Sequence, residues 1–418
     1  MNTAVAHLPT SASARAPSRW ERLMRTQVRA RLSGIRGALL SIEDVDGRVE
    51  FGEAGAPLRA HLRVGDPGLY PALVLRGSVG AAESYVRGEW TVDDLVALVR
   101  ILVRNRDLLD GLERGLARIG GALLRFGHRL RRNTRAGSRR NIAAHYDLGN
   151  EFFELFLSSD LMYSSALWQG SADTLEQASR RKLERIGELL ALRPEDHLLE
   201  IGSGWGGFAV FAAARYGCRV TTATISREQH RRAREAVARA GLQDRVTVLL
   251  EDYRALRGEY DKLVSIEMIE AVGEQYLPLY FGRLTRLLKP TGLALLQAIT
   301  IEDHRYAQAV RSVDFIKEHV FPGSFIPSIQ AMLAAKTAAS DLALIRLEDF
   351  GASYARTLAA WRQAFRQRLD AVRAQGFDDG FIRLWDFYLA YCEGGFRERA
   401  IGVAHLLFAR PGYRPAEG

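Results

Sequence analysis

Residues 198–208 read LLEIGSGWGGF, an apolar run that meets a turn dense in glycine and then opens into a second apolar segment. This order predicts a strand, a loop and a helix. The glycines let the backbone turn sharply and let the sugar of a bound nucleotide come close. They are Gly202, Gly204, Gly206 and Gly207. The stretch therefore predicts an α/β sheet with a nucleotide-containing cofactor across its first turn.

The residues around this turn favour S-adenosylmethionine over a nicotinamide dinucleotide. Glu200 precedes the first glycine by two positions. The next strand, predicted at 218–225, carries Thr224 near its end, and Gln229 follows shortly after it. These are neutral partners for a ribose, whereas the same strand of an NAD site usually ends in an acidic residue. We therefore expect Thr224 and Gln229 to contact the cofactor.

Further strands extend the sheet. The strand predicted at 245–250 is followed by Asp252, whose carboxylate can accept a hydrogen bond from an adenine amino group. The strand predicted at 262–266 is followed by Glu267. Side chains at the carboxyl ends of parallel strands lie where α/β sheets bind their ligands. The remaining strands are predicted at 293–299, 342–347 and 401–410. The fold class is therefore α/β, with a doubly wound sheet.

A helical insertion is predicted at 354–396, between the last two strands. It carries more large aromatic side chains than a connection between two strands requires, at Trp361, Trp385, Phe387, Tyr388 and Tyr391. Two interpretations stay open: these side chains roof an apolar substrate chamber, or they form the shared core of paired helices. An earlier aromatic stripe, at 152–156 within a helix predicted at 141–157, has helical spacing and is interpreted as core.

Length and composition indicate two domains. The chain has 418 residues, which is long for one domain. We predict a disordered tail at 1–20, a small α+β domain at 21–126, a basic linker at 127–140 and the α/β domain at 141–418. In the accessory domain we expect strands at 48–51 and 58–64. A helix should follow them, at 92–103.

Charge and cysteine content narrow the class of protein. The two cysteines, Cys218 and Cys392, have no framework spacing, so a reducing cytosol fits best, and we interpret Cys218 as core. No apolar run reaches transmembrane length. The formal net charge is +9, and the linker is rich in arginine. A solvated basic surface and attraction to a polyanion, either anionic lipid or nucleic acid, both remain open.

Several segments together resemble the cyclopropane fatty acid synthases and the related mycolic acid cyclopropane synthases. They run in family order from residue 141 almost to the end of the chain. The matching segments include HYDLGNEFFELFL, LMYSSALW, LLEIGSGWGGF, SIEMIEAVG, DFIKEHVFPGSFIPS and WDFYLAYCEGGFRERAIGVAHLLF. The glycine loop is general to methyltransferases, whereas HYDLGN, IEAVG and FIKEHVFPG are specific to this family.

The resemblance implies a class I methyltransferase fold at 141–418 with a helical insertion, and it implies that 21–126 is an accessory domain associated with lipid or membrane. It also implies an activity, the transfer of a methylene from S-adenosylmethionine to the cis double bond of an unsaturated acyl chain in a phospholipid. The expected location is then the cytoplasm, with peripheral attachment to the inner, anionic membrane surface. A homodimer is an open expectation, and we predict neither a nucleic-acid partner nor a metal site.

The resemblance also assigns residues to the cofactor and to catalysis. Tyr163 and Ser164 match the family's YS pair and should contact S-adenosylmethionine. The other expected cofactor residues are Gly202, Gly204, Thr224, Gln229 and Asp252. Glu270, in IEAVG, matches the family's active-site glutamate. His145 lies in HYDLGN, and we interpret it as structural, because a lone histidine beside a tyrosine and an aspartate is more often satisfied by its neighbours.

The chain departs from the family pattern around the base. Family members hold a bicarbonate ion, thought to be the base, with a cysteine, a histidine, the glutamate, a backbone group beside an isoleucine, and a tyrosine. Here the cysteine position is Ser165 and the histidine position is Gln297. Both side chains can still hydrogen-bond an anion. The retained members are Glu270, Ile299 and Tyr354.

Glu267 stands where many family members have glycine, three residues before Glu270. We hypothesise that Glu267 assists or replaces bicarbonate as the proton acceptor, because two close carboxylates in a dry pocket split their pKa values. The alternative is that Glu267 pairs with an arginine or a backbone amide and shapes the loop. The altered site leaves the product open: a cyclopropane, a methylene branch, or a methyl branch that needs a separate reductant.

Two hypotheses from other functional classes remain. A nucleic-acid methyltransferase would share the cofactor turn and grip phosphates with the basic linker. Against it, the sequence has neither an Asn/Asp-Pro-Pro-aromatic tetrapeptide nor a cysteine placed for attack on a pyrimidine. A catalytically silent membrane-binding protein is the other hypothesis, and the retention of Tyr163, Glu270 and Tyr354 argues against it.

Overall fold

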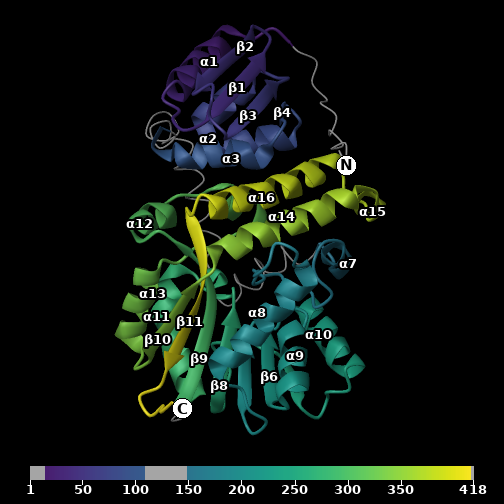
Figure 1. Cartoon of the computed structure of the whole chain (residues 1–418), viewed down its shortest axis with the longest axis vertical. Helices are drawn as coiled ribbons and strands as arrows, with labels where there is room; N and C mark the ends of the chain where they lie inside the picture. Colours follow the sequence, from purple (N-terminus) through teal and green to yellow (C-terminus); the bar gives the residue numbers. More distant parts are fainter. Residues whose placement is uncertain (1–14, 109–147, 416–418) are drawn as a thin grey trace.

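The computed structural model describes residues 15–108 and 148–415. An N-terminal domain lies against one end of a larger C-terminal domain (Figure 1). The basic linker at 127–140 and His145 lie outside the described residues. Within the described ranges, none of the helices is long and apolar enough to cross a membrane.

Within residues 15–108, the N-terminal domain combines a four-stranded sheet with three helices. Its elements are α1 (Arg19–Leu32), β1 (Leu39–Asp44), β2 (Gly47–Gly52), β3 (Arg59–Val64), α2 (Leu69–Val86), β4 (Trp90–Val92) and α3 (Leu95–Arg104). The strand order is β2-β1-β3-β4, and only the β1–β3 pair is parallel. The strands predicted at 48–51 and 58–64 are confirmed as β2 and β3.

Capping residues set two boundaries that the sequence prediction placed wrongly. Helix α1 begins inside 1–20, the predicted tail, because the Ser18 hydroxyl accepts a hydrogen bond from the N–H of Glu21 at 3.2 Å and closes the helix end. Helix α3 begins three residues later than predicted, because the Asp94 side chain accepts from the N–H of Ala97 at 2.9 Å.

The C-terminal domain is built on a seven-stranded sheet, and every strand predicted for it is present. The strands are β5 (His197–Ile201), β6 (Arg219–Thr224), β7 (Val246–Leu250), β8 (Tyr260–Ile266), β9 (Leu288–Ile301), β10 (Ala343–Asp349) and β11 (Ile401–Ala409). Their order is β10-β11-β9-β8-β5-β6-β7. Strand β11 runs antiparallel to both of its neighbours, whereas β5 to β9 are mutually parallel. The predicted doubly wound α/β class is confirmed.

Helices cover both faces of this sheet and one of its ends. They are α7 (Asn150–Glu154), α8 (Leu175–Leu190), α9 (Gly207–Tyr216), α10 (Arg227–Arg239), α11 (Leu277–Leu287), α12 (Asp303–Arg311), α13 (Ile329–Ala339), α14 (Gly351–Gln367), α15 (Leu369–Ala374) and α16 (Asp379–Arg397). Helices α14 to α16 form the predicted insertion. Helices α14 and α16 lie between the sheet and the N-terminal domain (Figure 1).

The two domains meet mainly through α16, which contacts α2 and α3. At one end of this contact, the guanidinium Nε atoms of Arg100 and Arg104 each lie 2.6 Å from the carboxylate of Glu398. Deeper in the contact, the rings of Tyr85 and Phe387 have centroids 5.6 Å apart. The N-terminal domain therefore extends the apolar core of the catalytic domain, and the two domains share one cluster of buried side chains.

The aromatic stripe at 152–156 is core, as predicted, although α7 covers only Asn150–Glu154 of the helix predicted at 141–157, of which 141–147 lie outside the described residues. Phe152, Phe153 and Phe156 are fully buried. The ring centroid of Phe152 lies 4.9 Å from that of Trp385 on α16, and the ring of Phe153 lies 5.0 Å from that of Trp205 in the glycine turn. These contacts fix the glycine turn against the helical insertion.

Candidate active site

A cavity of about 680 Å³ opens at the carboxyl ends of β5, β6, β7 and β8. The glycine turn forms part of its wall. Gly202 and Gly204 adopt φ angles of 98° and 47°, which other residues rarely take. A Cβ atom added at Gly204 would meet no atom within 4 Å, so the turn presents bare backbone to open space. This wall fits the ribose of S-adenosylmethionine, with no side chain in the way.

The predicted cofactor residues beyond the turn also line this cavity. The Thr224 hydroxyl donates to the Gln229 side-chain oxygen at 2.9 Å, so these two residues form one polar wall. The carboxylate of Asp252 accepts hydrogen bonds from the backbone N–H and from Nε of Arg254, at 2.9 and 2.8 Å. Arg254, which the sequence analysis did not single out, therefore holds Asp252 at the cavity wall.

Tyr163 and Ser164 lie on the cavity wall between the glycine turn and the helical insertion. The hydroxyl groups of Tyr163 and Tyr388 are 2.9 Å apart, which ties this loop to α16. The Ser164 hydroxyl accepts a hydrogen bond from the ammonium group of Lys182 at 2.9 Å. The YS pair thus joins the insertion on one side to a buried cation on the other.

Lys182 on α8 is fully buried behind the cavity wall. Burial lowers the pKa of its ammonium group to about 8, against the opposing charges of Asp160, Glu267 and Glu200. Burial likewise raises the pKa of Glu200 to about 8, and the Thr222 hydroxyl donates to that carboxyl at 2.6 Å. The cavity therefore has a positive charge directly behind it, which favours a negative charge at its floor.

Glu267 supplies that negative charge. It follows β8 with a φ of 48°, a left-handed conformation that glycine adopts without strain. One carboxylate oxygen accepts from the backbone N–H of Ser165 at 2.9 Å and from the amide nitrogen of Gln297 at 2.7 Å. The other accepts from the Tyr354 hydroxyl at 2.7 Å. Three donors converge on this buried carboxyl group. Burial raises its pKa, and the three hydrogen bonds and the charge of Lys182 oppose that rise.

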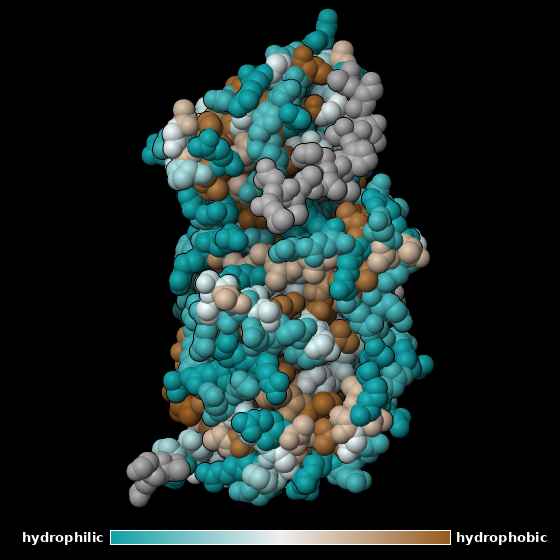
Figure 2. Space-filling view, turned by 45° about the vertical axis from the view of Figure 1, so that its right-hand side comes forward, coloured by the Kyte–Doolittle hydropathy of each residue, from teal (hydrophilic) through white to brown (hydrophobic). Residues whose placement is uncertain are grey.

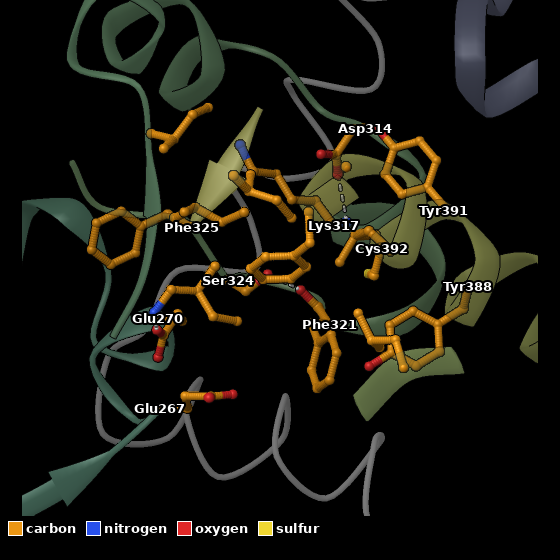
Figure 3. A pocket seen from close by; sticks show the side chains of 18 of the residues that line it. Glu267, Glu270, Asp314, Lys317, Phe321, Ser324, Phe325, Tyr388, Tyr391 and Cys392 are labelled. Atoms are coloured by element: carbon orange, nitrogen blue, oxygen red, sulfur yellow. Dashed lines mark hydrogen bonds between the residues drawn. The ribbon is translucent and has the colours of Figure 1, made fainter. Parts of the chain in front are cut away.

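Glu270 lies beside Glu267 at the same end of the cavity (Figure 3). One of its oxygens accepts from the backbone N–H of Ile299 at 2.6 Å. The other is buried and has no hydrogen-bond partner among the described residues. Burial, together with the charge of Glu267, raises the pKa of Glu270 to about 8. Burial raises the pKa of both carboxyl groups, but only Glu267 has three donors and Lys182 to oppose the rise, so the ionised form is favoured more at Glu267 than at Glu270.

Gln297 is oriented from behind by His405 on β11. The His405 Nε2 atom lies 3.0 Å from the amide oxygen of Gln297. Burial lowers the pKa of His405 to about 3, so the ring is neutral and its Nε2 carries the proton that an amide oxygen can accept. The amide nitrogen of Gln297 is therefore turned toward Glu267.

Ser165 contacts Glu267 through its backbone only. Its hydroxyl donates to the carbonyl of Ala166 at 3.0 Å, and only its backbone N–H reaches Glu267. The serine side chain thus makes no hydrogen bond to Glu267. The cause is local, because a hydroxyl this close to the backbone satisfies itself on the next carbonyl. Its role in holding an anion stays a prediction.

The same contacts test the fit of bicarbonate. The donors expected to hold such an ion are the ones that Glu267 and Glu270 already occupy: the N–H groups of Ser165 and Ile299, the Gln297 amide and the Tyr354 hydroxyl. An additional anion would meet the Glu267 carboxyl group and would find none of these donors free. The residues present do not fit bicarbonate, and the Glu267 carboxylate takes the position of the anion.

The aromatic residues of the insertion divide between the two interpretations left open by the sequence. Trp361 and Trp385 are core, each 1% exposed. Phe387, Tyr388 and Tyr391 line the cavity, together with Phe321 from the loop before α13 (Figure 3). Each interpretation is thus correct for part of the set. Cys218 is fully buried core, as predicted.

The architecture and this site define a class I S-adenosylmethionine-dependent methyltransferase. The family model for mycolic acid cyclopropane synthetase matches residues 133–406, and the chain belongs to that family.

Known relatives agree with this assignment. The chain is 38% identical over 346 residues to the tuberculostearic acid methyltransferase UfaA1 of Mycobacterium tuberculosis, with 80% of each chain covered. It is 35% identical over 354 residues to the cyclopropane-fatty-acyl-phospholipid synthase of Escherichia coli, covering 84% of this chain and 88% of that one. Among solved structures, mycolic acid cyclopropane synthase CmaA1 in complex with SAH and CTAB has a TM-score of 0.61 at 28% identity, covering 65% of this chain and 98% of that one.

Three residues that act on the site escaped the sequence analysis. Lys182 had a usable signal, since it shares the apolar face of α8 with Ala178, Ser179 and Ile186, and a lysine in such a position is buried. His405 and Arg254 carried no such signal, because each acts on a partner that only the sheet and its loops bring close.

Proposed function

We propose that this chain transfers a methylene from S-adenosylmethionine to the cis double bond of an unsaturated acyl chain of a phospholipid, and that the product is a cyclopropane fatty acid. The relative from E. coli is named for this reaction. The cavity supports the proposal, since apolar and aromatic side chains enclose most of it and a carboxylate pair stands at one end.

The alkene is a weak nucleophile toward the methyl group of S-adenosylmethionine, so the reaction depends mainly on positioning and on the exclusion of water. One alkene carbon bonds to the methyl carbon while the bond from that carbon to sulfur breaks, and the other alkene carbon becomes a cation. The rings of Tyr163, Phe321 and Tyr388 surround this part of the cavity, with centroid separations of 6.4 Å for Tyr163–Phe321 and 6.0 Å for Phe321–Tyr388. Their faces stabilise a cation that has no water around it.

Ring closure then needs a base, and we assign this role to Glu267. The carboxylate takes a proton from the transferred methyl group, and the electrons of that C–H bond close the ring onto the cation. The observation that carries this assignment is the set of three donors that hold an ionised carboxylate inside an apolar cavity. Glu270, which keeps its proton at neutral pH, adds no second negative charge.

A second product follows from the same site. A hydride shift from the methylated carbon to its neighbour moves the cation, and loss of a methyl proton to Glu267 then leaves an exocyclic methylene. Glu267 takes a proton from the transferred methyl group in both routes, so the altered base site is compatible with either product. The relative named as a tuberculostearic acid methyltransferase is consistent with a branched product.

Mass spectrometry of lipids tests the proposal and separates the products. The chain is expressed in a host without its own synthase and fed methionine with a trideuterated methyl group, beside a Glu267→Gln control. We expect a fatty acid heavier by one methylene with two deuterons, and little of it in the control. Chain fragmentation distinguishes the ring from the exocyclic methylene. No labelled lipid from the wild-type chain would refute the proposal.

We also propose that the enzyme works from the cytoplasmic side at an anionic membrane surface. The net charge of +9 supports this through attraction to anionic headgroups. On the face shown in Figure 2, apolar residues are scattered in small groups among hydrophilic ones. Such a face suits reversible attachment, so recovery of the protein on anionic vesicles should fall as salt rises. Equal recovery on neutral vesicles would contradict this.

A further inference from the structure

The cavity continues beyond the catalytic domain into the core of the N-terminal domain. Six of the side chains that line this second part come from five elements of that domain, and all are buried: Val28, Leu40, Ile42, Leu62, Leu69 and Leu98. We call this part the N-terminal arm, and the part beside Glu267 and Tyr163 the catalytic arm. A domain core is normally close-packed, so a hollow lined by core side chains calls for a ligand.

Helix α2 is built in a way that leaves room along this wall. It is interrupted at Gly77, whose φ of 55° and ψ of −137° are open to glycine alone. Gly77, Ser78 and Ala81 all line the cavity. The interruption therefore places small residues along the wall, where an unbroken helix with larger residues would fill the space.

The cavity wall turns polar at the junction of the domains. Arg106, just after α3, pairs with Glu302 at 2.7 Å, and Arg305 and Gln308 on α12 continue this part of the wall. Gln308 is exposed and Arg305 is half-buried, so these residues form a mouth to solvent. Helix α12 lies at the level of the junction (Figure 1). An apolar arm thus extends from a polar mouth into each domain.

We propose that the N-terminal arm holds the second, non-reacting acyl chain of a two-chain lipid. The reacting chain then lies in the catalytic arm, and the polar headgroup stays at the mouth with Arg106 and Arg305. A single chain would need one arm, whereas two apolar arms that share a polar mouth match two apolar chains joined to one polar group. This inference rests on the proposed function for the identity of the reacting chain.

Plugging the N-terminal arm tests the inference. In Leu62→Trp and Ala81→Phe, a larger side chain enters the arm, whereas Leu75→Trp enlarges an exposed residue of α2, 38% exposed, as the matched control. The substrates are dioleoyl phosphatidylglycerol and its one-chain form, oleoyl lysophosphatidylglycerol, both in detergent micelles. We expect the plugs to lower kcat/KM at least tenfold on the two-chain lipid and to leave the one-chain lipid unchanged.

Other outcomes overturn the inference. If the plugs lower both activities equally, the arm holds part of the reacting chain; if they lower neither, it holds no chain. A wild-type enzyme inactive on both lipids would instead refute the proposed function. Photo-crosslinking then still tests where the second acyl chain binds, because a phosphatidylglycerol with a diazirine on its saturated chain reports binding without turnover. Labelled peptides within 28–103 are expected, and labels confined to the catalytic domain would overturn the inference.

Discussion

Replacing Glu267 by glycine should convert the fixed base into an exchangeable one. The substitution removes the carboxylate and leaves three donors facing the gap: the Ser165 N–H, the Gln297 amide and the Tyr354 hydroxyl. The backbone tolerates the change, since glycine adopts a φ of 48° freely and relieves about 1–2 kcal/mol of left-handed strain. Against this, each donor left unpaired costs about 1–3 kcal/mol, so an anion that reaches the gap is bound strongly.

The expected magnitude follows from the role of a general base, whose loss typically costs about 10²–10⁴-fold in rate. Glu267→Gly should therefore lose at least about 10²-fold in kcat. Added bicarbonate should restore part of that loss, because the ion supplies a carboxylate to the same three donors. Glu267→Gln should lose as much and gain nothing, since its amide fills the gap and turns a donor toward Gln297.

The assay is turnover of unsaturated phospholipid at fixed pH and ionic strength, with and without bicarbonate, and with chloride as the control anion. Circular dichroism confirms that both variants are folded. Wild-type turnover in Glu267→Gln would refute the assignment of Glu267 as the base. Activity of Glu267→Gly that bicarbonate leaves unchanged would refute the idea that the carboxylate occupies an anion site.

Three further predictions concern buried charges. The pKa of Glu270 is raised from 4.5 to about 8. Its contribution to the free energy of unfolding is therefore full below pH 4.5 and falls as pH rises to 8, by at most about 1.4 kcal/mol per pH unit. In Glu270→Gln, the free energy of unfolding measured in urea should not show this decrease with pH. Lys182→Met removes the charge behind Glu267, so the acidic limb of the pH profile of kcat/KM should move to higher pH; an unmoved limb would contradict that coupling. Asp386 accepts hydrogen bonds from two arginines on α14, including Arg362 at 2.8 Å, and Asp386→Asn should lower the free energy of unfolding by about 3–5 kcal/mol, whereas a loss below 1 kcal/mol in urea would show that the arginines find other partners.

The sequence was sufficient for features that depend on local pattern. Apolar runs marked every strand of the large sheet, because strand formation and burial leave a periodic signature in the chain. Its limits were at the ends of elements. Ser18 and Asp94 moved two helix starts, because a single side-chain hydrogen bond decides where a helix begins.

Contacts between residues far apart in the chain could not be predicted from local pattern. Whether the aromatic residues of the insertion are core or cavity wall depends on which face of α16 meets α14 and which meets the N-terminal domain. On α16, Trp385 is core, whereas Tyr388 lines the cavity. The continuation of the cavity into the N-terminal domain had no sequence signal, because a hollow core and a filled one use the same apolar residues.

By itself, the sequence determined the α/β fold, the cofactor turn and the presence of Glu267 where the family often has glycine, since these are carried by residue types at fixed spacing. Only the tertiary structure decided what Glu267 does. Its three donors come from the loop before α8, from β9 and from α14, and Lys182 adds its charge from behind. The pKa of a carboxyl group depends on the burial and the partners around it in three dimensions, and no local pattern encodes those.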